Sequence, residues 1–441
     1  MSGPDVSGRR VMVLGASGLI GAALAADLAA AGAEVTAVAR RFAPQQRAHP
    51  GIRFVEAAFV DLPAEALAAL VREAAPEVVV NAAGALGADT AEAVHGGLVS
   101  RLLAALDALP GARLVQVSVP GTAEDDATAF SRTKRAADAA ILAHGEAAGR
   151  PHAIVRPGFV WAPVAFGGSA LLRGLAALPV DLPAAERARP FHAVAMEDVA
   201  ATIRHLVARA PDGPVAWDLM HPEPLTLGGA VDALRGWLGT GAPWVALPRP
   251  LLGVGARLGD LAARLGWRPP VRSVTLAELR RGVEGDPAPW IAATGIAPRS
   301  LAETLRARPA GVQERWFARL FLLKPLWIVT LAAFWVLSGA IALFVSYEAA
   351  HAILIGAGWP GPLAHATTVV SSLTDIGVGL LILHRRTCRA GLLLGIAVSL
   401  FYMAGAAVLT PAMWVEPLGA LVKTFPAIVL MLVALATLDE R

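Results

Sequence analysis

The distribution of charge along the chain constrains its fold most strongly. Residues 325–441 carry only five basic and five acidic side chains, although the whole chain of 441 residues has 38 and 35. Within this region, residues 325–346 have no charged side chain over 22 positions. A helix of this length spans about 33 Å at about 1.5 Å per residue, which is enough to cross a hydrocarbon core of about 30 Å. A part of ordinary charge density is therefore followed by a part that we expect to lie in a membrane.

Three more apolar stretches follow the first one. Together they predict a four-helix transmembrane bundle, with spans at about 325–346, 366–383, 390–409 and 418–438. Basic residues occur before the first span (Arg315, Arg319, Lys324) and between the second and third (Arg385, Arg386, Arg389), and the other two loops have none. Because Lys and Arg favour the cytoplasmic side of membrane helices, we expect both termini in the cytoplasm, at a bacterial-type inner membrane.

Asp375 lies in the middle of the second predicted span. A charged side chain at the centre of a membrane helix costs about 2.5–3.5 kcal/mol or more, so it is either hydrogen-bonded inside the bundle or part of a functional site. The functional alternative is a polar pocket for a quinone, a lipid headgroup or a proton. The basic segment 306–324, in which Trp and Phe alternate with arginines, is either a solvated helix or an interfacial helix on an anionic membrane surface.

The first 158 residues alternate between apolar strands and helices. Strands are expected at 10–14, 34–39, 52–59, 77–80, 113–118 and 152–156, and helices at 21–31, 63–74, 98–109 and 131–148. This alternation predicts an α/β fold with a Rossmann-type, doubly wound parallel sheet. The expected domains are a tail (1–8), a dinucleotide-binding core (9–158), a small mixed C-terminal lobe for the substrate (159–305), the basic connector (306–324) and the membrane domain (325–441).

A glycine motif, GASGLIG at 15–21, follows the first expected strand and opens a helix. Gly15 permits a tight turn, Gly18 lets the backbone approach a pyrophosphate, and Gly21 lets the helix pack close to the strand. The free N–H groups at the start of the helix then attract phosphate. This strand, turn and helix in order predict a dinucleotide site.

The end of the second strand indicates which dinucleotide is bound. An NAD site has an Asp or Glu there for the ribose 2′-hydroxyl. This chain has Arg40 and Arg41 instead, whose guanidinium groups can pair with a 2′-phosphate. NADP is therefore favoured over NAD, and the alternative is that both arginines are merely solvated.

The motifs GASGLIG, NAAG (81–84), RPG (156–158) and FHAVAMEDVA (191–200) occur in the order typical of one enzyme family. Residues 9–305 resemble an extended or atypical short-chain dehydrogenase/reductase, of the NAD-dependent epimerase/dehydratase type. The last 117 residues resemble the DoxX-like four-helix membrane domain, mostly by hydropathy. The motif and the resemblance place the expected cofactor contacts at Gly15, Ser17, Gly18, Leu19, Ile20, Gly21, Arg40, Arg41, Asp61, Asn81, Ala82, Ala83, Gly84, Lys134, Arg156 and Pro157.

One departure from the family affects the chemistry. The family's catalytic signature is Tyr-x-x-x-Lys with a Ser upstream, and the matching residues are Phe130, Lys134 and Ser118. A phenyl ring cannot exchange a proton, and losing a positioned acid or base typically costs ~10²–10⁴ in rate. The resemblance implies that Lys134 keeps a contact to the nicotinamide ribose and that Ser118 can still bind a carbonyl. The acidic run Glu124-Asp125-Asp126 could supply a substitute acid.

Three functions remain open at this point. The first is a membrane-anchored oxidoreductase or epimerase acting on a carbonyl, sugar-like, lipid or quinone substrate. The second is a non-catalytic NADP(H)-binding module with a structural or sensing role, and the third places the function in the membrane bundle around Asp375. The single cysteine, Cys388, excludes an internal disulfide or a Cys-cluster metal site, and a net charge of only +3 argues against nucleic acid as a partner.

Overall fold

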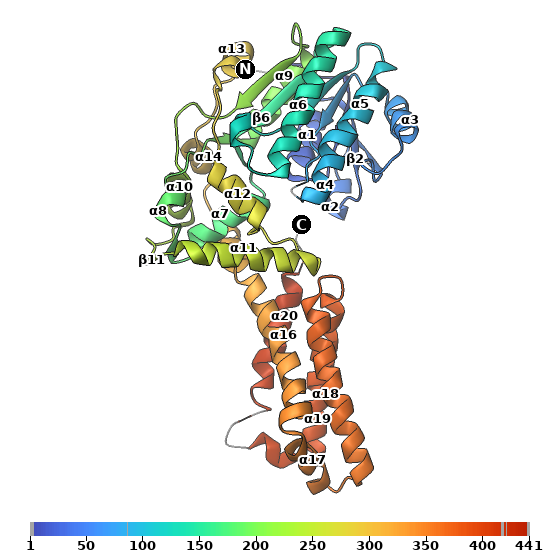
Figure 1. Cartoon of the computed structure of the whole chain (residues 1–441), viewed down its shortest axis with the longest axis vertical. Helices are drawn as coiled ribbons and strands as arrows, with labels where there is room; N and C mark the ends of the chain where they lie inside the picture. Colours follow the sequence, from blue (N-terminus) through green and yellow to red (C-terminus); the bar gives the residue numbers. More distant parts are fainter. Residues whose placement is uncertain (1–3, 86, 416–418, 420, 439–441) are drawn as a thin grey trace. The chain divides into compact units, whose positions relative to one another are not determined.

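The computed structural model describes residues 4–85, 87–415, 419 and 421–438 (Figure 1). The chain forms two compact units. The N-terminal unit comprises residues 1–256 and 270–318, and the membrane unit comprises residues 257–269 and 319–441.

A seven-stranded sheet forms the centre of the N-terminal unit, in the order β10-β6-β5-β4-β1-β2-β3. All neighbouring strands run parallel. The strands are β1 (Arg10–Leu14), β2 (Glu34–Ala39), β3 (Ile52–Glu56), β4 (Val78–Asn81), β5 (Arg113–Val117), β6 (Ala153–Pro157) and β10 (Val215–Leu219). The doubly wound parallel sheet expected from the sequence is confirmed.

Helices cover both faces of this sheet, so its strands are apolar on both sides. On one face α1 (Leu19–Ala30) and α9 (Met196–Ala208) pack against strand residues such as Val11 and Val13. On the other face α3 (Ala64–Ala74), α5 (Leu98–Asp107) and α6 (Ala129–Ala148) pack against Met12 and Leu14. The alternation along β1 therefore divides the apolar core into two layers.

A smaller lobe has its own apolar core. It contains the parallel pair β7 (Phe159–Trp161) and β9 (Ala193–Ala195), the pair β8 (Val180–Asp181) and β11 (Val245–Ala246), and the helices α7 (Gly167–Ala177), α8 (Ala184–Arg187), α10 (Leu227–Leu238) and α14 (Leu301–Ala307). Helix α9 and strand β10 lie within the expected lobe sequence but complete the main sheet domain, because β10 pairs with β6. The remaining helices before the bundle are α2 (Pro44–Arg47), α4 (Ala88–Glu92), α11 (Arg249–Arg264), α12 (Ser273–Arg281), α13 (Ala288–Thr294) and α15 (Val312–Phe321). Helices α11 and α15 each begin in the N-terminal unit and end in the membrane unit.

The membrane unit is a helical bundle. Its helices are α16 (Lys324–Ala340), α17 (Tyr347–Gly356), α18 (Gly361–Leu383), α19 (Cys388–Leu409) and α20 (Thr424–Ala436), and α16 continues through a π-helical turn (Ile341–Val345). Helices α16 and α18 approach closely at glycines: a Cβ on Gly339 would lie 2.3 Å from the carbonyl oxygen of Ser372, and one on Gly379 would lie 2.7 Å from that of Ala332. Small residues at such contacts are typical of packed membrane helices.

Three of the described helices are long and apolar enough to cross a membrane: Lys324–Val345, Gly361–Leu383 and Cys388–Leu409. They correspond to the first three predicted spans. The fourth predicted span, 418–438, contains α20 with 13 residues, about 20 Å at ~1.5 Å per residue, and residues 418 and 420 lie outside the described part. Helix α17 lies between the first two predicted spans, in a stretch for which the sequence predicts a loop.

Candidate functional site

The glycine motif forms the turn between β1 and α1. Gly15 has a φ of +75°, which disfavours any residue with a side chain, and a Cβ on Gly21 would lie 2.4 Å from the carbonyl oxygen of Gly15. Helix α1 starts at Leu19, and its N-cap Gly18 offers no side-chain cap. Its first N–H groups are therefore available to an anion, as the sequence predicted.

A second loop lies beside this turn, at the carboxyl end of β4. The chain crosses from one half of the sheet to the other between β1 and β4, which is where open α/β sheets bind ligands. Asn81 fixes this loop: its amide donates to Gln116 Oε1 at 2.8 Å, and its Oδ1 accepts the N–H of Ala83 at 3.1 Å. The backbone of Ala82 lies 3.0 Å from where a Cβ of Gly15 would stand. The predicted NAAG and glycine residues are thus brought together.

Arg40 and Arg41 follow β2, the neighbour of β1 on the other side. Both side chains are exposed. Neither forms a hydrogen bond or an ion pair with another residue in the described part of the chain. The nearby carboxylate of Glu56 is taken by the N–H of Phe42 at 3.0 Å and by Arg47. The two arginines are consequently available to a phosphate at the end of β2. Asp61, five residues beyond β3, is also exposed.

Lys134 is buried behind these loops. Its Nζ donates to the carbonyl oxygens of Val117 at 2.7 Å and Ala83 at 3.1 Å, so it joins the ends of β5 and β4. Burial lowers the pKa of this ammonium to about 8. An ammonium has three donors, so one remains for a ligand. This geometry fits the ribose contact that the resemblance implies.

Phe130 lies one turn before Lys134 on α6, and its ring packs edge-on against His95 at 5.4 Å between centroids. Thr133 donates its hydroxyl to the carbonyl of Ala129, so it accepts a hydrogen bond from His95 Nδ1 at 2.7 Å. The other ring nitrogen, Nε2, accepts the N–H of Ala85 at 3.2 Å. Both nitrogens of the imidazole are thus in use.

His95 therefore fastens the NAAG loop to α6 and is a positioning residue rather than a proton donor. It sits in a π-helical turn (Ala93–Gly97), a feature often found at functional sites. Burial, and after it the charge of Lys134, lower its pKa to about 3, so the ring is neutral. A lone histidine between two helices carries no motif, so the sequence alone does not single out His95.

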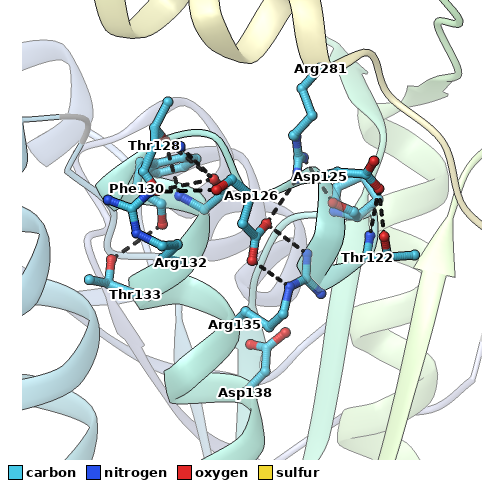
Figure 2. A network of polar contacts seen from close by, with 12 residues as sticks. Thr122, Asp125, Asp126, Thr128, Phe130, Arg132, Thr133, Arg135, Asp138 and Arg281 are labelled. Atoms are coloured by element: carbon cyan, nitrogen blue, oxygen red, sulfur yellow. Dashed lines mark hydrogen bonds and ion pairs between the residues drawn. The ribbon is translucent and has the colours of Figure 1, made fainter.

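The acidic run considered as a substitute acid is tied up in the loop that carries it. Asp125 accepts the N–H and the hydroxyl of Thr122, at 3.1 and 2.7 Å. Asp126 points toward Arg135 and Arg281, at 2.7 and 3.4 Å (Figure 2). These contacts give both aspartates a structural role in holding the loop, and Glu124 is exposed.

Helix α12 is fastened over the start of α6. Glu278 on α12 accepts hydrogen bonds from the hydroxyls of Thr128 and Ser131, the latter at 3.1 Å. Arg281 donates to the carbonyl of Pro120 at 2.9 Å. The residues in these contacts are more than 140 positions apart in the sequence, so no local sequence pattern could predict them.

Ser118 and Asp138 hold unused hydrogen-bonding capacity. Ser118 Oγ and Asp138 Oδ1 are buried and close to each other, and within the described residues neither makes a well-aligned hydrogen bond. The other oxygen of Asp138 accepts the Nε of Arg156 at 3.0 Å. Burial raises the pKa of Asp138, and the proximity of Ser118 opposes that rise. The guanidinium of Arg156 thus serves Asp138, while the predicted Pro157 ends β6.

Asp375 in α18 is hydrogen-bonded inside the membrane unit. Its Oδ1 accepts the hydroxyl of Tyr402 on α19 at 3.0 Å. An open groove of about 510 Å³ lies beside this pair and is lined in part by Ser371, Thr374 and Tyr402. The hydroxyls of Ser371 and Thr374 already donate to carbonyls of their own helix. The sequence alone does not connect Tyr402 with Asp375, because the two residues belong to different helices.

Comparison with known proteins agrees with both parts of this description. Residues 11–178 match the NAD dependent epimerase/dehydratase family, and residues 332–432 match the DoxX-like family. No curated protein matches the chain.

Solved structures share the fold of the N-terminal part. The epimerase Mth375 of Methanothermobacter thermautotrophicus superposes with a TM-score of 0.53 and 18% identity, over 72% of this chain and 94% of its own. WbmF of Bordetella bronchiseptica, solved with NAD+ and UDP, gives 0.53 and 15%, over 73% and 94%. The UDP-glucose 4-epimerase of Thermotoga maritima, solved with UDP-glucose, gives 0.53 and 14%, over 71% and 99%.

Proposed function

We propose that this chain, which joins an NAD-dependent epimerase/dehydratase domain to a DoxX-like domain with three membrane-length helices, is a membrane-anchored protein that binds NADP(H). The dinucleotide lies across the carboxyl ends of β4, β1 and β2. The glycine turn and the start of α1 hold its pyrophosphate, and Lys134 holds the nicotinamide ribose.

One observation carries the choice of NADP over NAD. Arg40 and Arg41 are exposed and directly follow β2. They stand where an NAD site has an Asp or Glu. Two guanidinium groups match the charge and geometry of a ribose 2′-phosphate, which NAD lacks. Binding titrations with NADPH and NADH, with and without the two arginines, test this proposal.

We further propose that the site binds the dinucleotide without fast carbonyl reduction. A bound nicotinamide supplies a hydride, but the reaction also needs a proton at the substrate oxygen. Phe130 has none to give, His95 beside it has both nitrogens engaged, and Asp126 is paired with arginines. These contacts favour a binding or sensing role for the N-terminal unit.

A catalytic role is the second candidate, and Ser118 and Asp138 favour it. A buried carboxyl with a raised pKa and a free oxygen beside an unpartnered hydroxyl could pass a proton to a substrate through that hydroxyl. Under this alternative, Ser118→Ala and Asp138→Asn abolish a wild-type oxidoreductase or epimerase activity. Under the binding role, Ser118→Ala leaves NADPH affinity and stability nearly unchanged.

For the membrane unit we propose both termini in the cytoplasm, at an inner membrane of bacterial type, since the basic loops alternate with uncharged ones. The groove beside Asp375 and Tyr402 would accept a lipid-soluble ligand with a hydrogen-bonding head, such as a quinone or a lipid. The aromatic residues of the connector, with Trp316 64% exposed on α15, favour an interfacial position for that segment.

A further inference from the structure

Helix α11 exposes an apolar face. Four large aliphatic side chains are each 49–60% exposed: Leu251, Val254, Leu258 and Leu261. Their spacing of three, four and three residues places them on one side of the helix. The opposite side contains Ala256 and Gly259, which are buried. Exposed aliphatic side chains that gather on a single helix face mark an interaction surface.

Arginines border this face. Arg257 and Arg264 are exposed and lie one helical step beside the aliphatic stripe, and Arg268 follows the helix end. Asp260 is the only acidic residue of the helix. A helix with leucines on one face and arginines at its border is suited to the surface of an anionic bilayer, where the leucines enter the acyl boundary and the guanidinium groups reach phosphates.

The C-terminal end of α11 is tied to the membrane bundle, within one compact unit. The indole Nε1 of Trp267 donates to the carbonyl oxygen of Leu383 at 2.8 Å, and Leu383 is the last residue of the membrane-length helix α18. Arg385 donates its backbone N–H to Leu265 at 3.0 Å, and its guanidinium lies 5.5 Å from the centre of the Trp267 ring.

These contacts place the end of α11 at the level where α18 leaves the membrane. Tryptophan and arginine are typical residues of that level. The nearby carbonyl of Leu438, after α20, accepts bonds from Lys324 and Arg385 at 3.2 and 3.1 Å, so further basic groups gather at the same end of the bundle. The exposed side chains near the end of α11 therefore lie close to this end of the bundle.

We propose that the part of α11 that belongs to the membrane unit lies on the membrane surface, with Leu258 and Leu261 inserted among the headgroups of an anionic bilayer (the helix labelled α11 in Figure 1). A bilayer is a better match for this face than a protein partner for two reasons. The helix ends next to the membrane-spanning bundle, and the charges that border the face are basic. The proposal rests on the membrane location of the bundle and not on dinucleotide binding.

Site-directed spin labelling of the full-length chain tests it. Cys388 is the only cysteine and is buried, so an introduced cysteine can be labelled selectively. We would place single cysteines by Leu258→Cys and Leu261→Cys, with Ala147→Cys, at an exposed position near the end of α6, as the water-facing control. The variants are reconstituted in nanodiscs with and without phosphatidylglycerol, and the collision of each label with oxygen and with a nickel chelate is measured.

The proposal predicts that labels at 258 and 261 meet oxygen more than the nickel chelate, with the difference growing when phosphatidylglycerol is present. The control label should favour the chelate in both lipids. Arg257→Gln with Arg264→Gln should weaken the lipid dependence. Labels at 258 and 261 that are as open to the chelate as the control would overturn the proposal, and so would labels shielded from both reagents, since a protein would then cover the face.

Discussion

The phenyl ring of Phe130 packs edge-on against the imidazole of His95, with 5.4 Å between the ring centroids. The position at which related enzymes present a phenol is therefore part of an apolar contact. Its neighbour is locked by Ala85 and Thr133. These contacts hold the loop beside the proposed cofactor site, and Phe130 itself has no proton to donate.

Phe130→Tyr should restore a phenol one helical turn from Lys134. Its ammonium, close by, would lower the phenol's pKa and favour proton exchange. We expect NADPH oxidation with a panel of carbonyl compounds to rise at least about tenfold over the wild type, with an upper limit set by the ~10²–10⁴ that a positioned acid supplies. Phe130→Leu is the control and should stay silent. Brisk wild-type turnover that the Tyr variant does not increase would speak for the Ser118 and Asp138 alternative.

Lys134→Met should weaken NADPH binding about tenfold, or about 1.4 kcal/mol, because a similar length of side chain is kept while the ammonium is lost. It should also lower the melting temperature, since the carbonyls of Ala83 and Val117 lose their donor at a cost of about 1–3 kcal/mol. Fluorescence titration and thermal unfolding of the full chain in detergent measure the two effects. Unchanged affinity in a folded variant would remove Lys134 from the cofactor site.

Stability should fall as the pH drops from about 7 to 5. Burial lowers the pKa of His95 to about 3 and that of His152 to about 4, below the value of about 6.5 expected in the unfolded chain. In this window the unfolded state binds more protons than the folded state, so the free energy of unfolding decreases by up to about 1.4 kcal/mol per pH unit for each histidine. The full stability is present above pH 6.5.

Thermal unfolding of the full chain between pH 7.5 and 5 checks this dependence. His95→Gln should be less stable at pH 7.5 but lose less on acidification, because one titrating group is gone. His49→Gln, away from the site, should follow the wild type. A wild-type melting temperature that is flat down to pH 5 would contradict buried neutral histidines.

Reporter fusions should place residue 355 and the C-terminus on opposite sides of the membrane, the C-terminus being cytoplasmic. The reason is the alternation of basic and uncharged loops. Helix α20 has only 13 residues, so this experiment also tests whether the last segment crosses. The four-span topology requires three crossings between these two positions. Both reporters on one side would mean an even number of crossings, and this topology would then be wrong.

The sequence predicted those parts of the fold whose signal is local. β1 and β2 have the predicted bounds, because short apolar runs end at glycine or arginine there. The glycine turn was predictable for the same reason, since a positive φ and a close helix approach each require a specific glycine. The long apolar helices followed from hydropathy and length alone.

The parts that were not predicted depend on contacts between distant residues. β10 joins the sheet only by pairing with β6. The hydrogen bond of His95 involves Thr133, which is 38 residues away. The sequence did not show that the aspartates of the acidic run have partners. In the folded chain, Asp126 forms ion pairs with Arg135 and Arg281. The exposure of the apolar face of α11 could not be predicted either, because an amphipathic pattern does not show which face of a helix remains uncovered.

The preference for NADPH over NADH is the most direct measure of the central claim. Dissociation constants of the full chain for both dinucleotides should differ by about tenfold or more in favour of NADPH, as two guanidinium groups on a phosphate imply. Arg40→Ala with Arg41→Ala should reduce that ratio to near one while leaving NADH affinity unchanged, and Arg53→Ala, a control that removes an exposed arginine paired with Glu73, should keep it. Equal affinities in the wild type, or a preference that survives the loss of both arginines, would contradict the account.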